Sequence, residues 1–319
     1  MSAFMSPDKD NLRDFLNQFV PGEVTAIEAT YQARNHLTCR FRSTSPQTNS
    51  RYLLVAALPG GRDRLEYAGS LIPYLIQLGL PITPCIPSSQ GEYVALYGDC
   101  PALLLKLPEG LSPKHGDIEV CRQIGSFLGK MHAKSQGFEP QYCNPRSLLW
   151  LNFAAEELSP LLSTGNESLL REQLNRFRRT VESVTDLPSG PLIGSIFPDQ
   201  LFFQGGKLEA VSGFYFSCTD WLLLDVAQAV NEWCCQANGE LDKHLCQALL
   251  NAYRVERPFT HTEGQYWQDI LCFSATRFWV SRLLTSLTGE PSTTARPPEE
   301  YQQKLQRRLM GYYPLPIQD

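Results

Sequence analysis

The sequence predicts an α+β protein of two lobes, a small β-rich lobe followed by a larger, mostly α-helical lobe. Short runs of apolar and β-branched residues, separated by turn residues, fill the first third of the chain and are typical of an antiparallel sheet. After Gly110 the apolar residues recur at spacings of three and four, which indicates helices. A short β-rich patch interrupts these helices between residues 192 and 211. We place the domain boundary between residues 107 and 108, which gives domains 1–107 and 108–319.

The first lobe is expected to contain five strands. A first helix begins after Pro7 and Asp8, carries Leu12 and Phe15 on an apolar stripe, and ends at Pro21. The strand-like runs are 24–29, 37–42, 52–58, 93–97 and 102–107. One helix, 64–78, is inserted between the third and fourth strands, and the polar stretch 43–50 is expected to be a loop.

The second lobe is expected to be helical apart from three short strands. The predicted helices are 117–134, 148–162, 167–184, 221–236, 241–253, 263–287 and 298–310. The predicted strands are 192–193, 201–203 and 208–211. Residues 289–297, which are rich in Pro, Ser and Thr, are expected to form a loop between the last two helices.

Composition excludes several classes of protein. With 43% hydrophobic residues in 319, the chain can bury a core and is not expected to be disordered. A net charge of -5 without a long Lys/Arg tract argues against nucleic-acid binding. No apolar run approaches ~18 residues, so no membrane span is expected. The first nine residues lack a signal-peptide pattern and none of the ten cysteines forms a CxxC pair. We therefore expect a cytoplasmic protein with reduced cysteines and no metal site built from them.

Two stretches have the layout of a phosphotransferase catalytic loop, 193–200, and of its metal-binding turn, 213–216. The first contains Phe197-Pro198-Asp199 and the second contains Phe214-Tyr215-Phe216. On these residues the chain resembles the homoserine kinases of the aminoglycoside phosphotransferase and choline kinase-like superfamily. Further matching segments are 224–227, 231–234, 257–260 and 277–283. The similarity covers nearly the whole chain and is densest from residue 194 to residue 284.

The resemblance implies a protein kinase-like bilobal fold, with ATP bound between the lobes and magnesium beside it. It also implies phosphoryl transfer to the hydroxyl of homoserine, a step of threonine biosynthesis. In such chemistry the protein contributes mainly positioning and charge stabilisation. The family uses a catalytic Asp as proton acceptor, an Asn and a second Asp for magnesium, and a Gly-containing loop over the phosphates.

Matched residue by residue, these groups are absent. Ser195 occupies the position of the catalytic Asp, and Gly213 occupies that of the metal-binding Asp. Gln200 stands in place of the Asn and retains only a neutral carbonyl oxygen. In the phosphate loop Thr30 replaces glycine, and only Asn35 matches. No catalytic residue or metal ligand is therefore intact, and Asn35 and Gln200 are the only remaining candidates for cofactor binding.

The losses at Ser195 and Gly213 have large expected consequences. A serine hydroxyl is neutral near pH 7 and cannot serve as a carboxylate base, a role worth ~10²–10⁴-fold in rate. A glycine offers no side-chain oxygen where magnesium prefers carboxylates. Where many kinases carry a phosphate-contacting Lys, this chain has Val55, although homoserine kinases do not always have a Lys there.

Three carboxylates near these positions in the sequence are candidates for roles other than those of the missing groups. Asp199, Asp220 and Asp225 fall where intact family members have similar residues, so they are candidates for substrate-side or structural roles. For Asp225 the structural reading is an anchor of the helix predicted over 221–236, and the functional reading is a ligand.

Three hypotheses follow. The first is a pseudokinase with impaired or absent phosphoryl transfer and a binding or regulatory role, exerted through a protein partner or a small-molecule ligand. The second is an active ATP-dependent kinase that phosphorylates the hydroxyl of homoserine or a related compound and uses ATP and Mg²⁺. The third is a structural subunit that pairs with an intact homologue.

Overall fold

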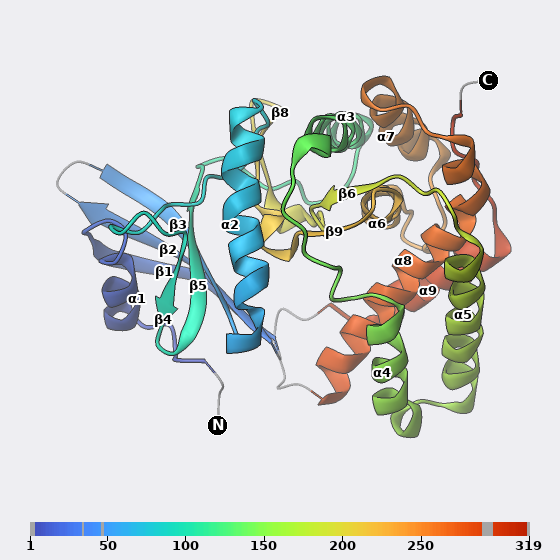
Figure 1. Ribbon diagram of the computed structural model, residues 1–319, viewed down its shortest axis with the longest axis horizontal. Helices are drawn as coiled ribbons and strands as arrows, with labels where there is room; N and C mark the ends of the chain where they lie inside the picture. Colours follow the sequence, from blue (N-terminus) through green and yellow to red (C-terminus); the bar gives the residue numbers. More distant parts are fainter. Residues whose placement is uncertain (1–3, 34, 46–47, 289–295, 318–319) are drawn as a thin grey trace. The chain divides into compact units, whose positions relative to one another are not determined.

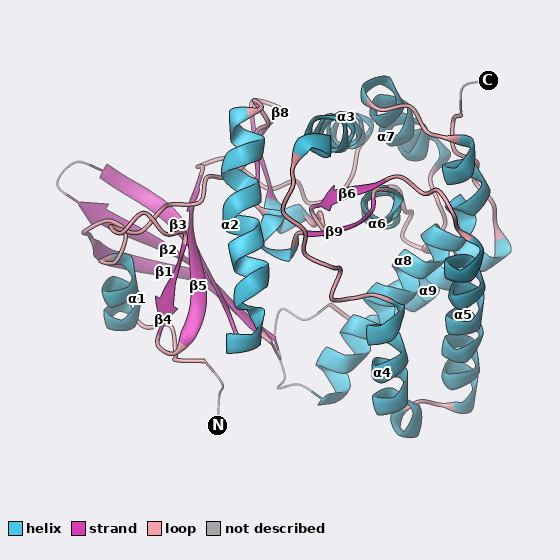
Figure 2. Cartoon of the chain, viewed as in Figure 1, coloured by secondary structure: helices cyan, strands magenta, loops and turns pink. Residues whose placement is uncertain are grey.

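The computed structural model describes residues 4–33, 35–45, 48–288 and 296–317 (Figures 1 and 2). They divide into two compact units. The first comprises Met1–Pro113, Phe138–Tyr142 and Pro198–Ser217, and the second comprises Lys114–Gly137, Cys143–Phe197 and Cys218–Asp319. The domain boundary expected between residues 107 and 108 stays a prediction.

The first unit contains a five-stranded sheet whose paired strands are all antiparallel. Its strands are β1 (Glu23–Ala33), β2 (His36–Ser45), β3 (Thr48–Ala57), β4 (Val94–Tyr97) and β5 (Cys100–Leu107). Their order in the sheet is β1-β2-β3-β5-β4. This arrangement confirms the predicted small antiparallel β lobe.

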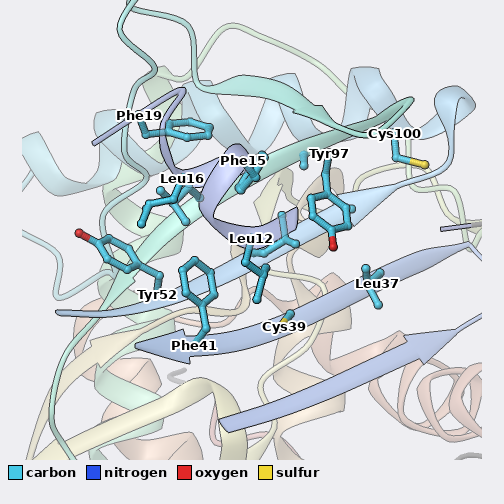
Figure 3. Close-up of a cluster of buried hydrophobic side chains, with 14 of the residues drawn as sticks. Leu12, Phe15, Leu16, Phe19, Leu37, Cys39, Phe41, Tyr52, Tyr97 and Cys100 are labelled. Atoms are coloured by element: carbon cyan, nitrogen blue, oxygen red, sulfur yellow. The ribbon is translucent and has the colours of Figure 1, made fainter. Parts of the chain in front are cut away.

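One face of this sheet is covered by α1 (Lys9–Leu16) (Figure 3). The helix begins at its N-cap Asp8, whose carboxylate accepts a 2.8 Å hydrogen bond from the backbone N–H of Asn11. Leu12, Phe15 and Leu16 are buried against apolar side chains of β2 and β3, as the periodicity of the sequence predicted. Burial of such side chains provides most of the stability of a helix this short.

The other face of the sheet packs against α2 (Arg62–Gln77), which follows the short 3₁₀ turn η1 (Pro59–Gly61). The contact is close at Gly69, where a Cβ atom would lie 2.9 Å from the Cβ of Tyr93 and 3.8 Å from Leu103. A larger residue at position 69 would push the helix away from the sheet.

The prediction of a loop over 43–50 is wrong for most of these residues. β2 and β3 stay in register through Ser43↔Ser50, Thr44↔Asn49 and Ser45↔Thr48. The pairing continues because the ladder of backbone hydrogen bonds, which does not require apolar side chains, extends to this end of the hairpin. Residues 46 and 47 lie outside the described residues.

The first unit also contains the β7–β8 hairpin, from Leu201–Gln204 and Lys207–Val211. Gly205 and Gly206 turn the chain between the strands with φ of 57° and 77°, a conformation that favours glycine. Backbone bonds tie β8 to the segment after α2, since Val211 donates to the carbonyl of Pro81 and accepts from Thr83, both at 3.0 Å.

The second unit is mostly helical. Its helices are α3 (Ile118–Lys134), α4 (Leu148–Leu158), α5 (Thr164–Ser183), α6 (Leu223–Trp233), α7 (Lys243–Glu256), α8 (His261–Thr288) and α9 (Pro298–Met310). All seven predicted helices are present, with ends shifted by a few residues. The loop predicted over 289–297 lies mostly outside the described residues, and residues 296–297 form coil before α9.

A two-stranded sheet of β6 (Ser189–Leu192) and β9 (Cys218–Trp221) lies beside these helices (Figure 1). The sequence did not predict β9, because the polar Thr219 and Asp220 interrupt it and leave no apolar run. Consequently the helix predicted from residue 221 begins two residues later, at Leu223.

Helices α3 and α7 approach each other closely through two glycines. A Cβ on Gly125 would lie 2.0 Å from the carbonyl oxygen of Leu249, and a Cβ on Gly129 would lie 2.7 Å from that of Tyr253. Among the described residues, no helix combines the length and apolar content that a bilayer crossing requires.

Candidate functional site: a loop clamped through its backbone

In the second unit, the loop that follows β6 is held by the carboxylate of Asp225. The backbone N–H of Ile193 donates to one carboxylate oxygen at 2.7 Å, and that of Gly194 donates to the other at 2.9 Å. Asp225 lies in the first turn of α6 and is only 2% exposed. Gly194 has a φ of 81°, which lets two successive N–H groups face one carboxylate. Asp225 therefore fixes the path of the loop.

Three further side chains bind the backbone of the same loop. Gln228 accepts a 2.9 Å bond from the N–H of Ile196, whose carbonyl accepts a 2.7 Å bond from the indole N–H of Trp233. From α8, Arg277 donates to the carbonyl of Gly194 at 3.3 Å. Ser195, at the centre of the loop, is 3% exposed. The backbone of residues 193–196 is thus held by four side chains of the second unit, around a buried serine.

A network of buried polar side chains extends from Asp225 through His132 of α3 to Tyr253 of α7. The His132 ring lies 3.4 Å from Asp225 and 2.8 Å from the Tyr253 hydroxyl. Arg257 donates to that hydroxyl at 3.1 Å and to Glu263 at 2.9 Å. Burial raises the pKa of Tyr253, so its hydroxyl stays neutral at physiological pH. Because each buried group has a partner, the chain avoids the cost of an unsatisfied polar atom.

In the first unit, Gln200 ends the 3₁₀ turn η4 (Pro198–Gln200) and is buried. Its side-chain NH₂ group donates to the Tyr215 hydroxyl at 3.4 Å, and its backbone carbonyl accepts a 2.8 Å bond from the backbone N–H of Ser212. Gly213 begins the next turn, η5 (Gly213–Phe216), and is not among the glycines of the described residues with positive φ. Burial also raises the pKa of Tyr215.

The other two candidate carboxylates are engaged in different places. Asp199, in the first unit, is exposed and lies 3.3 Å from the guanidinium of Arg40 on β2. Asp220, in the second unit, accepts 2.8 Å bonds from the side chain of Asn144 and from the backbone N–H of Trp221. The substrate-side role expected for Asp199, Asp220 and Asp225 stays a prediction.

The segment that matches the family's phosphate loop is a regular hairpin. Thr30 pairs with Cys39 across β1 and β2, and the ladder runs on to the pair Ala33↔His36. Asn35 lies just beyond that pair, 3.1 Å from the His36 ring nitrogen through its side-chain oxygen. Val55, on β3, is fully buried and offers no charge.

The residues present do not fit the magnesium set implied by the resemblance. Gln200 is buried with its amide turned to Tyr215, and Gly213 has no side chain. In the described part of the chain, no group of three or more His, Cys, Asp and Glu side chains could hold a metal ion. We therefore derive no chemical step through a metal.

Beyond Asp225, the sequence did not reveal Gln228 and Arg277, which hold the loop backbone, or Tyr253, which contacts His132. Gln228 could have been found, because it lies three residues after Asp225 and so on the same face of α6. Arg277 and Tyr253 could not, since their contacts join residues 83 and 121 positions apart in the chain.

The antiparallel five-stranded sheet with α2, together with the helical second unit, defines the fold of the protein kinase-like phosphotransferases. Among solved structures, the chain resembles amicoumacin kinase with a TM-score of 0.70 at 12% identity, covering 95% of this chain and 92% of that one. It resembles the spectinomycin phosphotransferase APH(9)-Ia with a TM-score of 0.63 at 10% identity, covering 95% of each chain.

The sequence gives a narrower classification. The model of the "Phosphotransferase enzyme family" matches residues 41–259. The homoserine kinase of Cupriavidus necator is 30% identical, over 97% of this chain and 96% of its own. The homoserine kinase of Pseudomonas aeruginosa is 29% identical, over 97% and 96%. The chain therefore belongs to the phosphotransferase enzyme family and is homoserine kinase-like.

Proposed function

We propose that this chain is a pseudokinase: a homoserine kinase-like protein in which phosphoryl transfer is impaired or absent and a binding or regulatory role remains. The observation that carries the proposal is the state of the loop around Ser195. Its backbone is anchored by Asp225, Gln228 and Arg277, yet the position of the proton acceptor is a buried serine.

Asp225, a described carboxylate of the second unit that contacts this loop, is not free to take over the role of the base. Asp225 already accepts two backbone N–H bonds and faces His132, so moving it would release the loop that it holds. The loss of the metal-binding Asp at Gly213 acts in the same direction.

The alternative is an active kinase that transfers phosphate from ATP to the hydroxyl of homoserine or a related compound. The anchored loop backbone favours this alternative, since a protein without catalytic activity would not need to retain the contacts that hold this loop. The third role, a structural subunit paired with an intact homologue, would need a protein partner. All three are proposed for a cytoplasmic protein.

Two measurements separate the first two proposals. Thermal unfolding is followed with ATP, with and without Mg²⁺, and release of ADP is followed with homoserine as acceptor. The homoserine kinase of Cupriavidus necator serves as the positive control. The pseudokinase should show homoserine-dependent turnover at least about 100-fold lower, from the loss of the base alone. Magnesium-dependent stabilisation by ATP together with comparable turnover would establish the active kinase instead.

Restoring the missing groups tests whether the rest of the machinery is intact. The double variant Ser195→Asp with Gly213→Asp returns the base and the metal ligand. Its matched control, Ser195→Asn with Gly213→Asn, adds nearly the same volume without the charges. ADP release that appears in the Asp pair and not in the Asn pair would show that these two positions account for the loss.

A further inference from the structure

Arg64 is a buried arginine whose Nε and Nη2 atoms have no hydrogen-bonding partner among the described residues. It is the third residue of α2 and is 7% exposed, and its Nε and Nη2 atoms are buried and bond to nothing in the first unit. Its neighbour Arg62, by contrast, is exposed and pairs with Glu66 at 2.7 Å. A buried charged donor left without a partner is costly, so such a group points to something that binds there.

The surroundings of Arg64 offer aromatic rings but no counter-ion. Its guanidinium lies 5.6 Å from the centre of the Phe216 ring. Burial lowers the pKa of Arg64, and the hydroxyls of Tyr142 and Tyr215 oppose this only in part. An arginine nevertheless stays protonated in proteins. The site therefore holds a positive charge that no carboxylate of the described residues neutralises.

The guanidinium also lies at the N-terminal end of its own helix. Its Nη2 atom is 3.8 Å from the position that a Cβ on Gly61 would occupy. Gly61 is the N-cap of α2 and supplies no side-chain acceptor to the first turn. The N-terminus of a helix carries a partial positive charge that disfavours cations and attracts anions. Two positive features thus coincide at one place.

We infer that Arg64 and the first turn of α2 form a binding site for a phosphate group, either free as inorganic phosphate or carried by a nucleotide. The Nε and Nη2 atoms form one edge of the guanidinium, which suits two oxygens of the same oxyanion. A phosphate, with up to two negative charges, gains more from a cation and a helix N-terminus together than a carboxylate does. The site needs no metal ion and stands whether or not the chain transfers phosphate.

The test uses the full chain in EDTA without homoserine, so its failure leaves the turnover result unaffected. Binding of inorganic phosphate, ADP and acetate is measured by calorimetry and thermal unfolding. The test variant is Arg64→Met. The matched control is Arg62→Met, at an exposed position two residues earlier in the same helix. Arg64→Met should keep or raise the melting temperature without ligand, because it removes an unpaired buried charge, and should raise the Kd for phosphate at least about tenfold.

Arg64→Lys keeps the charge and loses the two-donor edge, so it should also weaken binding while the protein stays folded. A tighter Kd for ADP than for phosphate would identify a nucleotide as the source of the group, and the reverse would identify free phosphate. The inference is overturned if neither ligand binds the wild-type chain, or if acetate binds as tightly as both. It is also overturned if both Arg64 variants bind phosphate as the wild type does.

Discussion

The carboxylate of Asp225 accepts a 2.7 Å hydrogen bond from the backbone N–H of Ile193, 32 residues earlier in the chain. Through this bond and its companion to Gly194, a side chain of α6 determines the path of the loop that contains Ser195. The loop is therefore fixed within the second unit, and its proposed role as a catalytic loop without a proton acceptor stays a prediction.

Asp225→Asn should destabilise the protein by about 1–3 kcal/mol, because an amide can accept only one of the two N–H bonds and places an NH₂ group against the other. Urea unfolding measures the free energy, and hydrogen exchange at Ile193 and Gly194 reports the loop itself. Asp186→Asn, at an exposed position, is the matched control. Unchanged stability and unchanged exchange at both amides would show that the bonds from Ile193 and Gly194 to Asp225 do not stabilise the loop.

Gly125→Ala should destabilise by about 1–3 kcal/mol or more, since overpacking forces two elements apart. The new Cβ would lie 2.0 Å from the carbonyl oxygen of Leu249, so α3 and α7 must separate. Gly165→Ala, at an exposed position of α5 with nothing within 4 Å, should instead stabilise. Thermal unfolding should therefore shift in opposite directions for these two changes, and a shift in the same direction would contradict the packing described.

Stability should fall in acid partly through Glu300. Burial alone would raise its pKa, but Lys304 and Arg282 outweigh it and hold the pKa of Glu300 at about 2, against an ordinary value of 4.5. A lowered pKa stabilises the fold above pH 4.5, and this contribution is lost as the pH falls from 4.5 toward 2. Glu300→Gln should flatten the loss of unfolding free energy in this window, whereas Glu299→Gln, its exposed neighbour, should leave the profile as in the wild type.

At alkaline pH, Tyr253 should contribute to a loss of stability as the pH rises. Burial raises its pKa, so the neutral phenol stabilises the fold fully below the ordinary value near 10 and this contribution is lost as the pH rises above it. Tyr253→Phe should cost about 1–3 kcal/mol at pH 8, because His132 and Arg257 lose their common partner. It should also make the decline in stability above about pH 10 shallower.

Tyr312→Phe is the control for this change, since Tyr312 is 66% exposed. Urea unfolding at several pH values compares the two. Equal alkaline profiles for Tyr253→Phe and the wild type would contradict a raised pKa at this hydroxyl.

Much of the fold could be predicted from the sequence, because it depends on local patterns. The periodic stripes of α1 and α3, with their N-caps Asp8 and Asp117, mark helices that the structure confirms. The expected loop at 43–50 failed for a physical reason: polar side chains say little about pairing when backbone bonds extend a hairpin. Strand β9 was missed because Thr219 and Asp220 leave it without an apolar run.

The candidate site was predictable only in part. The sequence predicts that Ser195 and Gly213 stand at the positions of the catalytic and the metal-binding Asp, on the basis of Phe197-Pro198-Asp199 and Phe214-Tyr215-Phe216, and this assignment stays a prediction. The contacts of Asp225 with His132, and of His132 with Tyr253, depend on tertiary packing between residues 93 and 121 positions apart. No local pattern contains that information, nor does one reveal that Arg64 is buried without a partner.

The central claim is that phosphoryl transfer is impaired or absent, and homoserine-dependent ADP release in the presence of ATP and Mg²⁺ tests it most directly. With the Cupriavidus necator homoserine kinase measured under the same conditions, we expect a rate at or near the background without homoserine. Restoration of both carboxylates, through Ser195→Asp and Gly213→Asp, should raise it. Turnover by the unaltered chain within about tenfold of the active relative would contradict the claim, since a missing base alone should cost ~10²-fold or more.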